Sequence, residues 1–403
     1  MIPFSPPRID QKIIDEVTAA LKSGWITTGP RTKQFEKMIT EYAGHQATLC
    51  LNSGSAGLEL MLRWFGVGDG DEVILPAYTY SATANVVMHC GARPVFVDAG
   101  EDFNMDVDQV QKAITPRTKV IMPVDIAGWP CDYDAINALV RKKEVKQLFS
   151  PRNDVQQQLG RILVLADAAH SIGAQYKGKK SGSLTDISVF SFHAVKNLTT
   201  AEGGAVCLNL PEPFNNEKIY KQLAIKSLHG QTKDALAKVQ AGNWQYDVIE
   251  PGYKCNMTDI QAAMGIIELP RYEGDMLVRR KAIFDRYRKG FEDKEWALLP
   301  AYENEEKTSS FHIFLLRIKG ITEEMRNAVM SKIFAREVSV NVHFIPLPLL
   351  TFYKKCGYRM EDYPVSYANY SRVISLPVYY DLSDENVDTV IRAVVEFVEE
   401  VLS

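Results

Sequence analysis

The stretch Ile162-Leu163-Val164-Leu165-Ala166-Asp167-Ala168-Ala169-His170 decides the fold class. Its first five residues form a continuous apolar run, which is typical of a parallel strand covered on both faces by helices. Similar short runs recur through the first half of the chain, with helical patterns between several of them. A helical pattern over Ile9–Lys22 precedes the first run. The further expected strands are Ala47–Leu51, Glu72–Leu75, Pro94–Val97, Val120–Val124, Ile187–Phe192 and Ala205–Leu208. The sequence therefore predicts an α/β fold with a mostly parallel sheet flanked by helices.

The last third of the chain follows a different pattern. A helical stretch from Thr258 through Arg288 is expected to kink or break at Pro270, because proline has no N–H to donate. Beyond it we expect a strand, a helix, a second strand and a final helix capped by Ser383, the first three at Phe311–Ile318, Glu323–Arg336 and Val338–Phe344. These elements predict a large domain over residues 1–270 and a smaller C-terminal α+β domain over 271–403.

Two connecting segments depart from this regular alternation. Trp244–Asn256 is loop-like in composition. Lys142–Gly160 is long and polar, although most connections between a helix and a strand need only a few residues. We expect the second segment to be a surface excursion, and we assign it no function.

Composition excludes several classes of protein. The 403 residues carry a formal net charge of -4 without a long run of like charges, so no nucleic-acid-binding arm is expected. The first residues, Met1 to Ser5, lack a signal-peptide pattern, and no apolar run approaches the roughly 20 residues that span a bilayer. The six cysteines form no C-x-x-C pair, so neither a disulfide framework nor a metal site is expected. These features predict a cytoplasmic protein with reduced thiols.

Two ionisable residues follow buried strands. Asp167 ends the apolar run 162–166, where a carboxylate is costly unless a cation pairs with it. A protonated pyridine nitrogen could be that cation, although an aspartate capping the next helix is an equal alternative. Lys196 follows the strand at 187–192, where partial burial could lower its pKa enough for Schiff-base chemistry. An ordinary surface lysine is the simpler alternative.

Two further strand ends carry suitable side chains. Ser53-Gly54-Ser55-Ala56 lies between a strand and a helix, where free N–H groups can bind an anion. A serine cap without a ligand is equally consistent with that segment. Tyr80 follows the strand at 72–75 and could stack on a planar ring or simply pack in the core. Because ligands bind at the carboxyl ends of parallel strands, the four signals together predict one site.

At this level of detail the chain resembles the DegT/StrS-type nucleotide-sugar aminotransferases, which are pyridoxal 5'-phosphate (PLP) enzymes of fold type I. It is most similar to those that aminate C4 of UDP-4-keto sugars, such as the UDP-4-amino-4-deoxy-L-arabinose aminotransferases, which share the histidine at position 170. The resemblance rests on four motifs spread along the chain: Ser23–Pro30, Asp167–His170, Ser191–Lys196 and Pro251–Ile260.

The resemblance implies a role for each matching residue. Lys196 would form the Schiff base with PLP and move the proton, and Asp167 would pair with the pyridine nitrogen. Tyr80 would stack on the ring, and His170 would lie near its 3′-oxygen. The phosphate would be held by Ser55, the backbone of Ala56, Ser191 and, from a neighbouring subunit, Asn256. The active unit would therefore be a homodimer with shared active sites. The substrate would be contacted by Thr27, His193 and His343.

The resemblance also implies the reaction. The amino donor, L-glutamate, would leave its amino group on the cofactor as pyridoxamine phosphate, and a nucleotide-linked 4-keto sugar would then accept it. A sugar dehydratase of the same family would have histidine where this chain has Lys196. A non-catalytic regulatory member would be free to lose Lys196 or Asp167, and this chain keeps both. The sequence does not distinguish the sugar, the nucleotide, or C3 from C4 amination.

Overall fold

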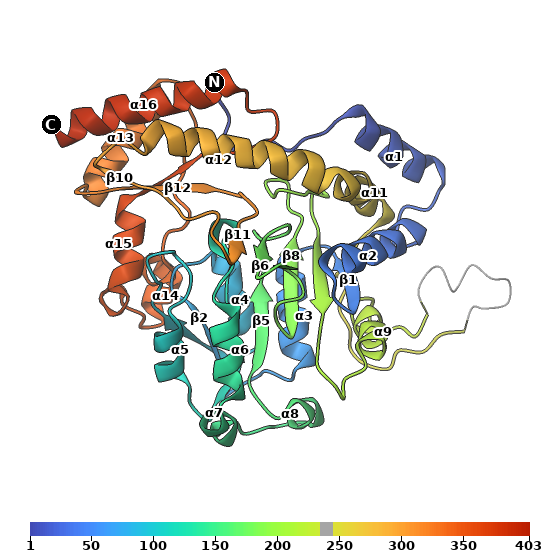
Figure 1. Ribbon diagram of the computed structural model, residues 1–403. Helices are drawn as coiled ribbons and strands as arrows, with labels where there is room; N and C mark the ends of the chain where they lie inside the picture. Colours follow the sequence, from blue (N-terminus) through green and yellow to red (C-terminus); the bar gives the residue numbers. More distant parts are fainter. Residues whose placement is uncertain (234–244) are drawn as a thin grey trace.

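The computed structural model describes residues 1–233 and 245–403, which places Trp244 outside the described part. Within these residues a seven-stranded sheet has the order β1-β9-β8-β5-β4-β2-β3 (Figure 1). Its strands are β1 (Ala47–Leu51), β2 (Glu72–Pro76), β3 (Arg93–Val97), β4 (Thr118–Ile121), β5 (Leu163–Asp167), β8 (Ile187–Ser191) and β9 (Gly204–Leu208). β9 runs antiparallel to both of its neighbours, β1 and β8, and the pairs β8–β5, β5–β4, β4–β2 and β2–β3 are parallel. The predicted α/β class with a mostly parallel sheet is therefore confirmed.

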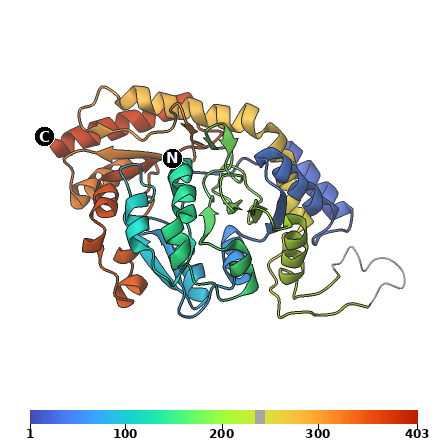
Figure 2. The same ribbon diagram turned by 60° about the horizontal axis from the view of Figure 1, so that its bottom comes forward.

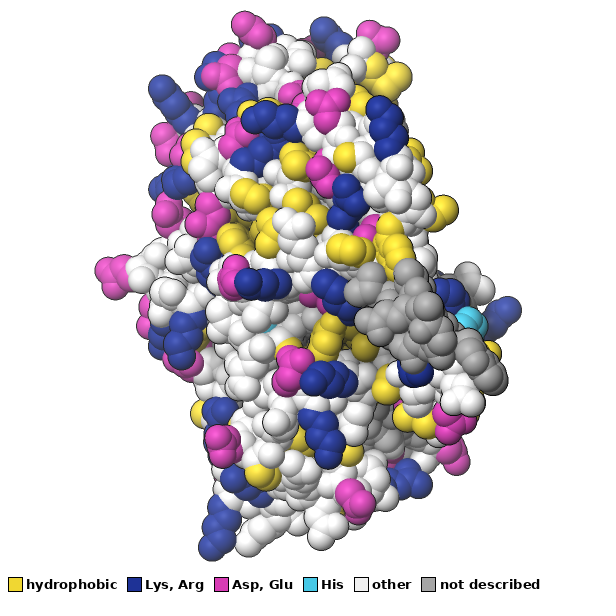
Figure 3. All heavy atoms as spheres, turned by 90° about the vertical axis from the view of Figure 1, so that its right-hand side faces the viewer, with side chains coloured by type: hydrophobic (Ala, Val, Ile, Leu, Met, Phe, Trp, Pro, Cys, Tyr) yellow, Lys and Arg dark blue, Asp and Glu magenta, His cyan; other side chains and the backbone are white. Residues whose placement is uncertain are grey.

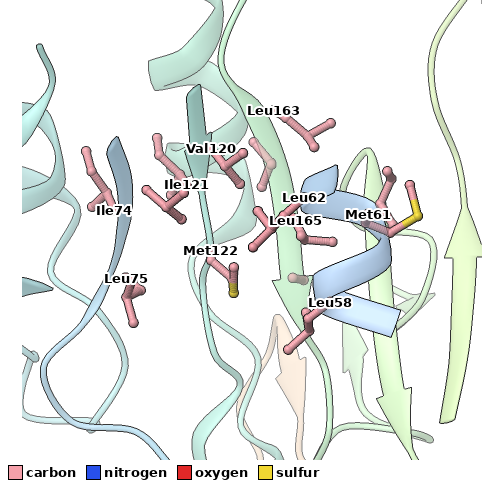
Figure 4. Packing of buried hydrophobic residues seen from close by; sticks show 14 of the residues in the cluster. Leu58, Met61, Leu62, Ile74, Leu75, Val120, Ile121, Met122, Leu163 and Leu165 are labelled. Carbon is pink, nitrogen blue, oxygen red and sulfur yellow. The ribbon is translucent and has the colours of Figure 1, made fainter. Parts of the chain in front are cut away.

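Helices cover both faces of this sheet because successive strand residues point to opposite sides. In β8, Val189 packs on the side of α3 (Gly54–Trp64), whereas Phe190 packs on the side of α2 (Pro30–Ala43). Figure 4 shows Leu58, Met61 and Leu62 of α3 against the apolar side chains of β4 and β5. The other helices of this part of the chain are α1 (Gln11–Lys22), α4 (Ser81–His89), α5 (Val107–Ala113), α6 (Tyr133–Arg141), α7 (Lys143–Leu148), α8 (Asp154–Leu159), α9 (Asn216–Lys226) and α11 (Asp259–Glu268).

The C-terminal elements lie together on one side of the molecule (Figure 2). They contain a second hydrophobic core. A three-stranded sheet of β10 (Ala297–Leu298), β12 (Phe314–Ile318) and β13 (Val373–Leu376) packs there with α12 (Val278–Phe291), α13 (Glu323–Ala335) and α16 (Asp384–Leu402). The short helices α14 (Thr351–Lys355) and α15 (Pro364–Arg372) complete this part. Ile2 also belongs to this core, so the N-terminal segment is attached to the C-terminal elements. The domain boundary near residue 270 stays a prediction.

The predicted C-terminal elements are confirmed with one exception. The stretch 258–288 breaks at Pro270, where a turn of 3₁₀-helix, Leu269–Arg271, separates α11 from the rest. Ser383 caps α16 by accepting a hydrogen bond from the N–H of Asn386. The predicted strand at 338–344 is wrong. That segment makes only isolated bridges, because Val338 pairs with Ile2 and Asn341 with Ser375, so no continuous ladder forms.

The polar connection 142–160 lies against the end of the sheet opposite the strands' carboxyl ends. It contains α7 and α8, and the side chains of Asn153 and Gln156 donate hydrogen bonds to the carbonyl of Phe65. A small sheet of β6 (Gln175–Tyr176), β7 (Lys179–Lys180) and β11 (Lys307–Thr308) ties the two parts of the chain together. Over the described ranges, every helix is too short or too polar to cross a membrane.

Candidate active site

The carboxyl ends of the strands open onto a cavity of about 360 Å³. Loops after β1, β2, β5 and β8 form its walls, together with the N-terminal segment and three segments of the C-terminal part. Eight of the residues predicted for the site line this one cavity: Ser55, Tyr80, Asp167, His170, Ser191, His193, Lys196 and His343. The topology thus brings together residues that are up to 288 positions apart in the sequence, from Ser55 to His343.

Asp167 is the last residue of β5 and is buried. One carboxylate oxygen accepts a hydrogen bond from the Thr83 hydroxyl at 2.8 Å, and the other accepts from the N–H of Ala169 at 3.2 Å. Within the described ranges the carboxylate forms no ion pair. Burial raises the pKa of Asp167, and the two hydrogen bonds oppose that shift. A cation placed beside this carboxylate would therefore be strongly held.

Lys196 lies in the turn that follows β8, where its N–H donates to the carbonyl of His193 at 2.9 Å. Its amine makes no hydrogen bond or ion pair with the described residues. Desolvation lowers the pKa of Lys196 to about 8, and the nearby charge of Asp167 limits the decrease. About a tenth of the amine is therefore neutral at pH 7, and the neutral form is the nucleophile.

The N-terminus of α3 meets the end of β8 at one edge of the cavity. Ser53 caps the helix by accepting from the N–H of Ala56 at 3.1 Å. A Cβ atom on Gly54 would lie 3.2 Å from the Cβ of Ser191, so glycine allows this close approach. The N–H groups of the first helical turn, which have no partner inside the helix, and the hydroxyls of Ser55 and Ser191 thus surround one position suited to an anion.

Four aromatic side chains, Phe4, Tyr80, His343 and Phe344, also line the cavity. Tyr80 is 61% exposed, and its ring lies 5.8 Å from that of Phe344. Phe4 stacks on His343 with 5.3 Å between ring centroids. The sequence did not indicate Phe4, Phe344 or His312. They belong to segments without a strand-to-helix junction, so only the tertiary fold brings them to the site.

Three predicted residues do not line the cavity: Ala56, Thr27 and Asn256. The N–H of Ala56 serves the helix cap, as described above. The carbonyl of Thr27 accepts from the N–H of Asp259, and the Asn256 side chain donates to the hydroxyl of Thr28 at 2.6 Å. The motifs 23–30 and 251–260 therefore meet each other outside the cavity of their own chain.

The residues present fit PLP. A buried carboxylate without a cation suits the protonated pyridine nitrogen, and an unpaired amine at Lys196 suits the aldehyde carbon. The anion-binding groups at the start of α3 suit the phosphate, and Tyr80 offers a ring for stacking. Where the chain is described, no group of three or more His, Cys, Asp or Glu side chains could hold a metal ion.

Comparison with known proteins agrees with this arrangement. A family model described as the DegT/DnrJ/EryC1/StrS aminotransferase family matches residues 7–150 and 153–395. The uncharacterized protein MJ1066 of Methanocaldococcus jannaschii is 40% identical over 99% of this chain and 98% of its own length. The spore coat polysaccharide biosynthesis protein SpsC of Bacillus subtilis is 38% identical over 99% of this chain and 97% of its own.

The fold is also close to that of a solved structure. The protein provisionally named sugar aminotransferase Spr1654, from Streptococcus pneumoniae, has a TM-score of 0.95 and 47% identity in its pyridoxamine phosphate (PMP) form, with complete coverage of both chains. Its PLP form gives a TM-score of 0.94 and 45% identity. The similarity therefore extends over the whole described chain and includes a protein that binds PLP.

Proposed function

The chain belongs to the DegT/DnrJ/EryC1/StrS aminotransferase family, whose members depend on PLP, and we propose that it transfers an amino group from L-glutamate to a nucleotide-linked 4-keto sugar. The observation that carries this proposal is that one cavity contains both Lys196 and Asp167. An unpaired lysine amine and a buried carboxylate without a cation both face the same space of about 360 Å³.

When bound, PLP supplies an electron-withdrawing ring that makes the donor's α-hydrogen acidic. Asp167 would hold the ring nitrogen in its protonated form, and Thr83 orients that carboxylate. Ser55, Ser191 and the first turn of α3 would hold the phosphate, with Tyr80 against the ring and His170 beside the ring oxygen. The Lys196 amine would accept the α-proton of the donor and deliver it again, because its lowered pKa lets it do both near neutral pH.

The alternatives fit these residues less well. A dehydratase of this family would not need a lysine amine at position 196. A non-catalytic member would have no need of a buried carboxylate such as Asp167, which costs stability when it has no cation. Keeping both residues in one cavity favours transamination.

The sugar acceptor is supported by the family and by SpsC, whose name refers to spore coat polysaccharide biosynthesis. His193 and His343 line the cavity and are the residues of this chain that we assign to substrate contacts. The His193 side chain is about half exposed at the cavity edge, where a bulky nucleotide would enter, whereas His343 lies deeper.

We further propose a homodimer with shared sites. Thr27 and Asn256 lie outside the cavity of their own chain, and in this proposal they contribute to the partner's cavity. Figure 3 shows hydrophobic side chains among lysine and arginine side chains on the face that carries α1 and α2. Exposed apolar residues there include Ile9, Ile14, Leu21 and Ile26. A second copy of the chain would cover them.

The decisive experiment combines the cofactor with a panel of acceptors. The purified protein, loaded with PLP, is mixed with L-glutamate and then with UDP- and dTDP-linked 4-keto sugars, and the formation of 2-oxoglutarate and amino sugar is measured. We expect glutamate to bleach the visible absorbance and one nucleotide class of keto-sugar to restore it. Lys196→Ala should abolish both changes in absorbance. Lys142→Ala, which removes an exposed lysine instead, is its matched control and should leave both changes intact. Failure of every keto-sugar to restore the band would refute the proposed acceptor.

A further inference from the structure

Two histidines stand side by side in the cavity wall, and the proposed reaction gives a role to only one of them. His170 follows β5, and His312 precedes β12 in the C-terminal part. Their ring centroids are 4.4 Å apart, both side chains line the cavity, and both residues are buried. Their hydrogen-bond partners determine which ring nitrogen of each carries the proton.

The tautomer of His312 is set through Asn197. The Asn197 side-chain nitrogen donates to the carbonyl of Ser310 at 2.7 Å, and a carbonyl can only accept. The amide oxygen of Asn197 is therefore the atom that lies 2.7 Å from Nδ1 of His312, and an amide oxygen can only accept as well. Nδ1 of His312 must then carry the proton. Its Nε2, the nitrogen left for the cavity, has a free lone pair.

The tautomer of His170 is the opposite one. The backbone N–H of Ala127 lies 3.3 Å from Nδ1 of His170, and a backbone N–H can only donate. Nδ1 of His170 must accept, so the proton of the neutral ring sits on Nε2. Burial, together with the charge of Lys196, lowers the pKa of both histidines well below the usual value, so both rings are neutral near pH 7.

The surrounding backbone holds the two rings rigidly. The buried guanidinium of Arg280 donates to the carbonyls of Phe311 and His312, each at 3.2 Å. Phe311 has a φ of 54°, a left-handed conformation that is costly for a phenylalanine and that these contacts maintain. The hydroxyl of Ser310 donates to the carbonyl of His170 at 2.5 Å, which joins the segments that carry the two histidines.

We propose that His312 and His170 form a fixed acceptor–donor pair that binds one hydroxyl group in the cavity, with Nε2 of His312 accepting and Nε2 of His170 donating. The proposal rests on the proposed function for the identity of the ligands. The hydroxyl belongs either to the ring of the cofactor or to the sugar. Asn197 is a positioning residue, because it acts through His312.

Two substitutions of His312 separate this role from packing. The asparagine amide group reaches the position of Nδ1, whereas that of glutamine reaches the position of Nε2. His312→Asn keeps the contact with Asn197 and loses the acceptor in the cavity, so we expect a loss of at least about tenfold in kcat/KM for the keto-sugar. His312→Gln keeps an acceptor in the cavity and should stay within about threefold of the unmodified enzyme.

Two measurements identify the source of the hydroxyl. If it is the cofactor's, His312→Asn weakens PLP retention in equilibrium dialysis by about tenfold or more. If it is the sugar's, PLP retention stays unchanged while the KM for the keto-sugar rises. The proposal is overturned if His312→Asn performs as well as His312→Gln or better, both in kcat/KM for the keto-sugar and in PLP retention.

Nitrogen NMR of cofactor-free protein labelled in its seven histidines provides a readout that needs no activity. We expect the Nδ1–H tautomer at His312 and the Nε2–H tautomer at His170, with signals assigned by His312→Asn and His170→Gln. The reverse tautomer at either residue overturns the pair. The proposed function fails separately, when glutamate does not bleach the bound cofactor of the unmodified enzyme.

Discussion

Strands β5 and β8 have buried ionisable residues near both of their ends. These residues form an ion pair at the amino ends and none at the carboxyl ends. At the amino ends, Arg161 and Asp186 form a two-pronged ion pair with N–O distances of 2.7 and 2.6 Å. Asp186 also accepts from the N–H of Val164 at 3.0 Å. Every charge there has a partner of opposite sign.

At the carboxyl ends, Asp167 and Lys196 face the same cavity without forming an ion pair. Burial disfavours both charged forms, so it raises the pKa of Asp167 and lowers that of Lys196. An end whose charges are paired contributes to stability when intact. An end whose charges lack partners is unfavourable until a ligand supplies them. The comparison predicts that substitutions at the two ends change different quantities.

Lys196→Ala should have the largest effect. Removing the amine removes both the attachment of the cofactor and the group that moves the proton, so we expect turnover to fall on the order of 10⁴-fold or more. The folded protein should keep its thermal midpoint, because the lost amine has no partner among the described residues. Steady-state rates and thermal unfolding of the same preparation measure the two quantities. Normal turnover by this variant would remove the central claim.

Arg161→Met should lower the stability of the fold and leave turnover unchanged. It leaves the buried carboxylate of Asp186 without its cation, so we expect a decrease of about 3–5 kcal/mol in the free energy of unfolding. The kcat of the protein that remains folded should be unchanged. Denaturant titration measures the loss. The double variant Arg161→Met/Asp186→Asn is the control and should recover most of it, since no buried charge is left unpaired and the amide oxygen can still accept from the N–H of Val164. A single variant as stable as the unmodified protein would show that the pair contributes nothing.

Much of the fold could be predicted from the sequence because its strands are continuous apolar runs. The predicted Ala47–Leu51 coincides with β1, and the break at Pro270 follows from one missing N–H. The error at 338–344 has a physical cause. Its β-branched residues favour a strand, but a ladder needs a continuous partner, and Ile2 and Ser375 pair with it only singly.

The site was predictable only where a strand-to-helix junction carries the residue. Asp167, Lys196, Ser55 and Tyr80 all follow strands, and the rule for parallel sheets brings such residues together. His312 is the second residue of an expected strand, and nothing in Phe311-His312-Ile313-Phe314 shows that Asn197 will be its partner. That contact joins residues 115 positions apart and depends on how the C-terminal part packs against the sheet.

Asp167→Asn tests the carboxyl ends by removing charge while keeping size. The ring nitrogen would lose the group that keeps it protonated, so we expect kcat to fall by at least about a hundredfold with PLP still bound. The thermal midpoint of cofactor-free protein should be kept or raised, because an unfavourably buried carboxylate is gone. If Asp167 only capped the segment after β5, asparagine would replace it and both quantities would stay unchanged. An unchanged single-turnover rate would therefore contradict our assignment.

The smallest effect concerns pH and follows from the lowered pKa of Lys196. Only the neutral amine attacks the aldehyde of PLP. With a pKa of about 8, about a tenth of Lys196 is neutral at pH 7 and most of it at pH 9, so the capture of PLP by cofactor-free protein should accelerate about tenfold and then level off. A solvated lysine with a pKa near 10.4 would give roughly a hundredfold rise over the same range without levelling.

Stopped-flow absorbance at five pH values distinguishes the two curves. The reaction of PLP with N-acetyl-lysine corrects for the titration of PLP itself, and Lys196→Ala gives the contribution of other lysines. A hundredfold rise would mean that the carboxyl ends of the strands do not desolvate Lys196, and the contrast with the Arg161–Asp186 end would then rest on Asp167 alone.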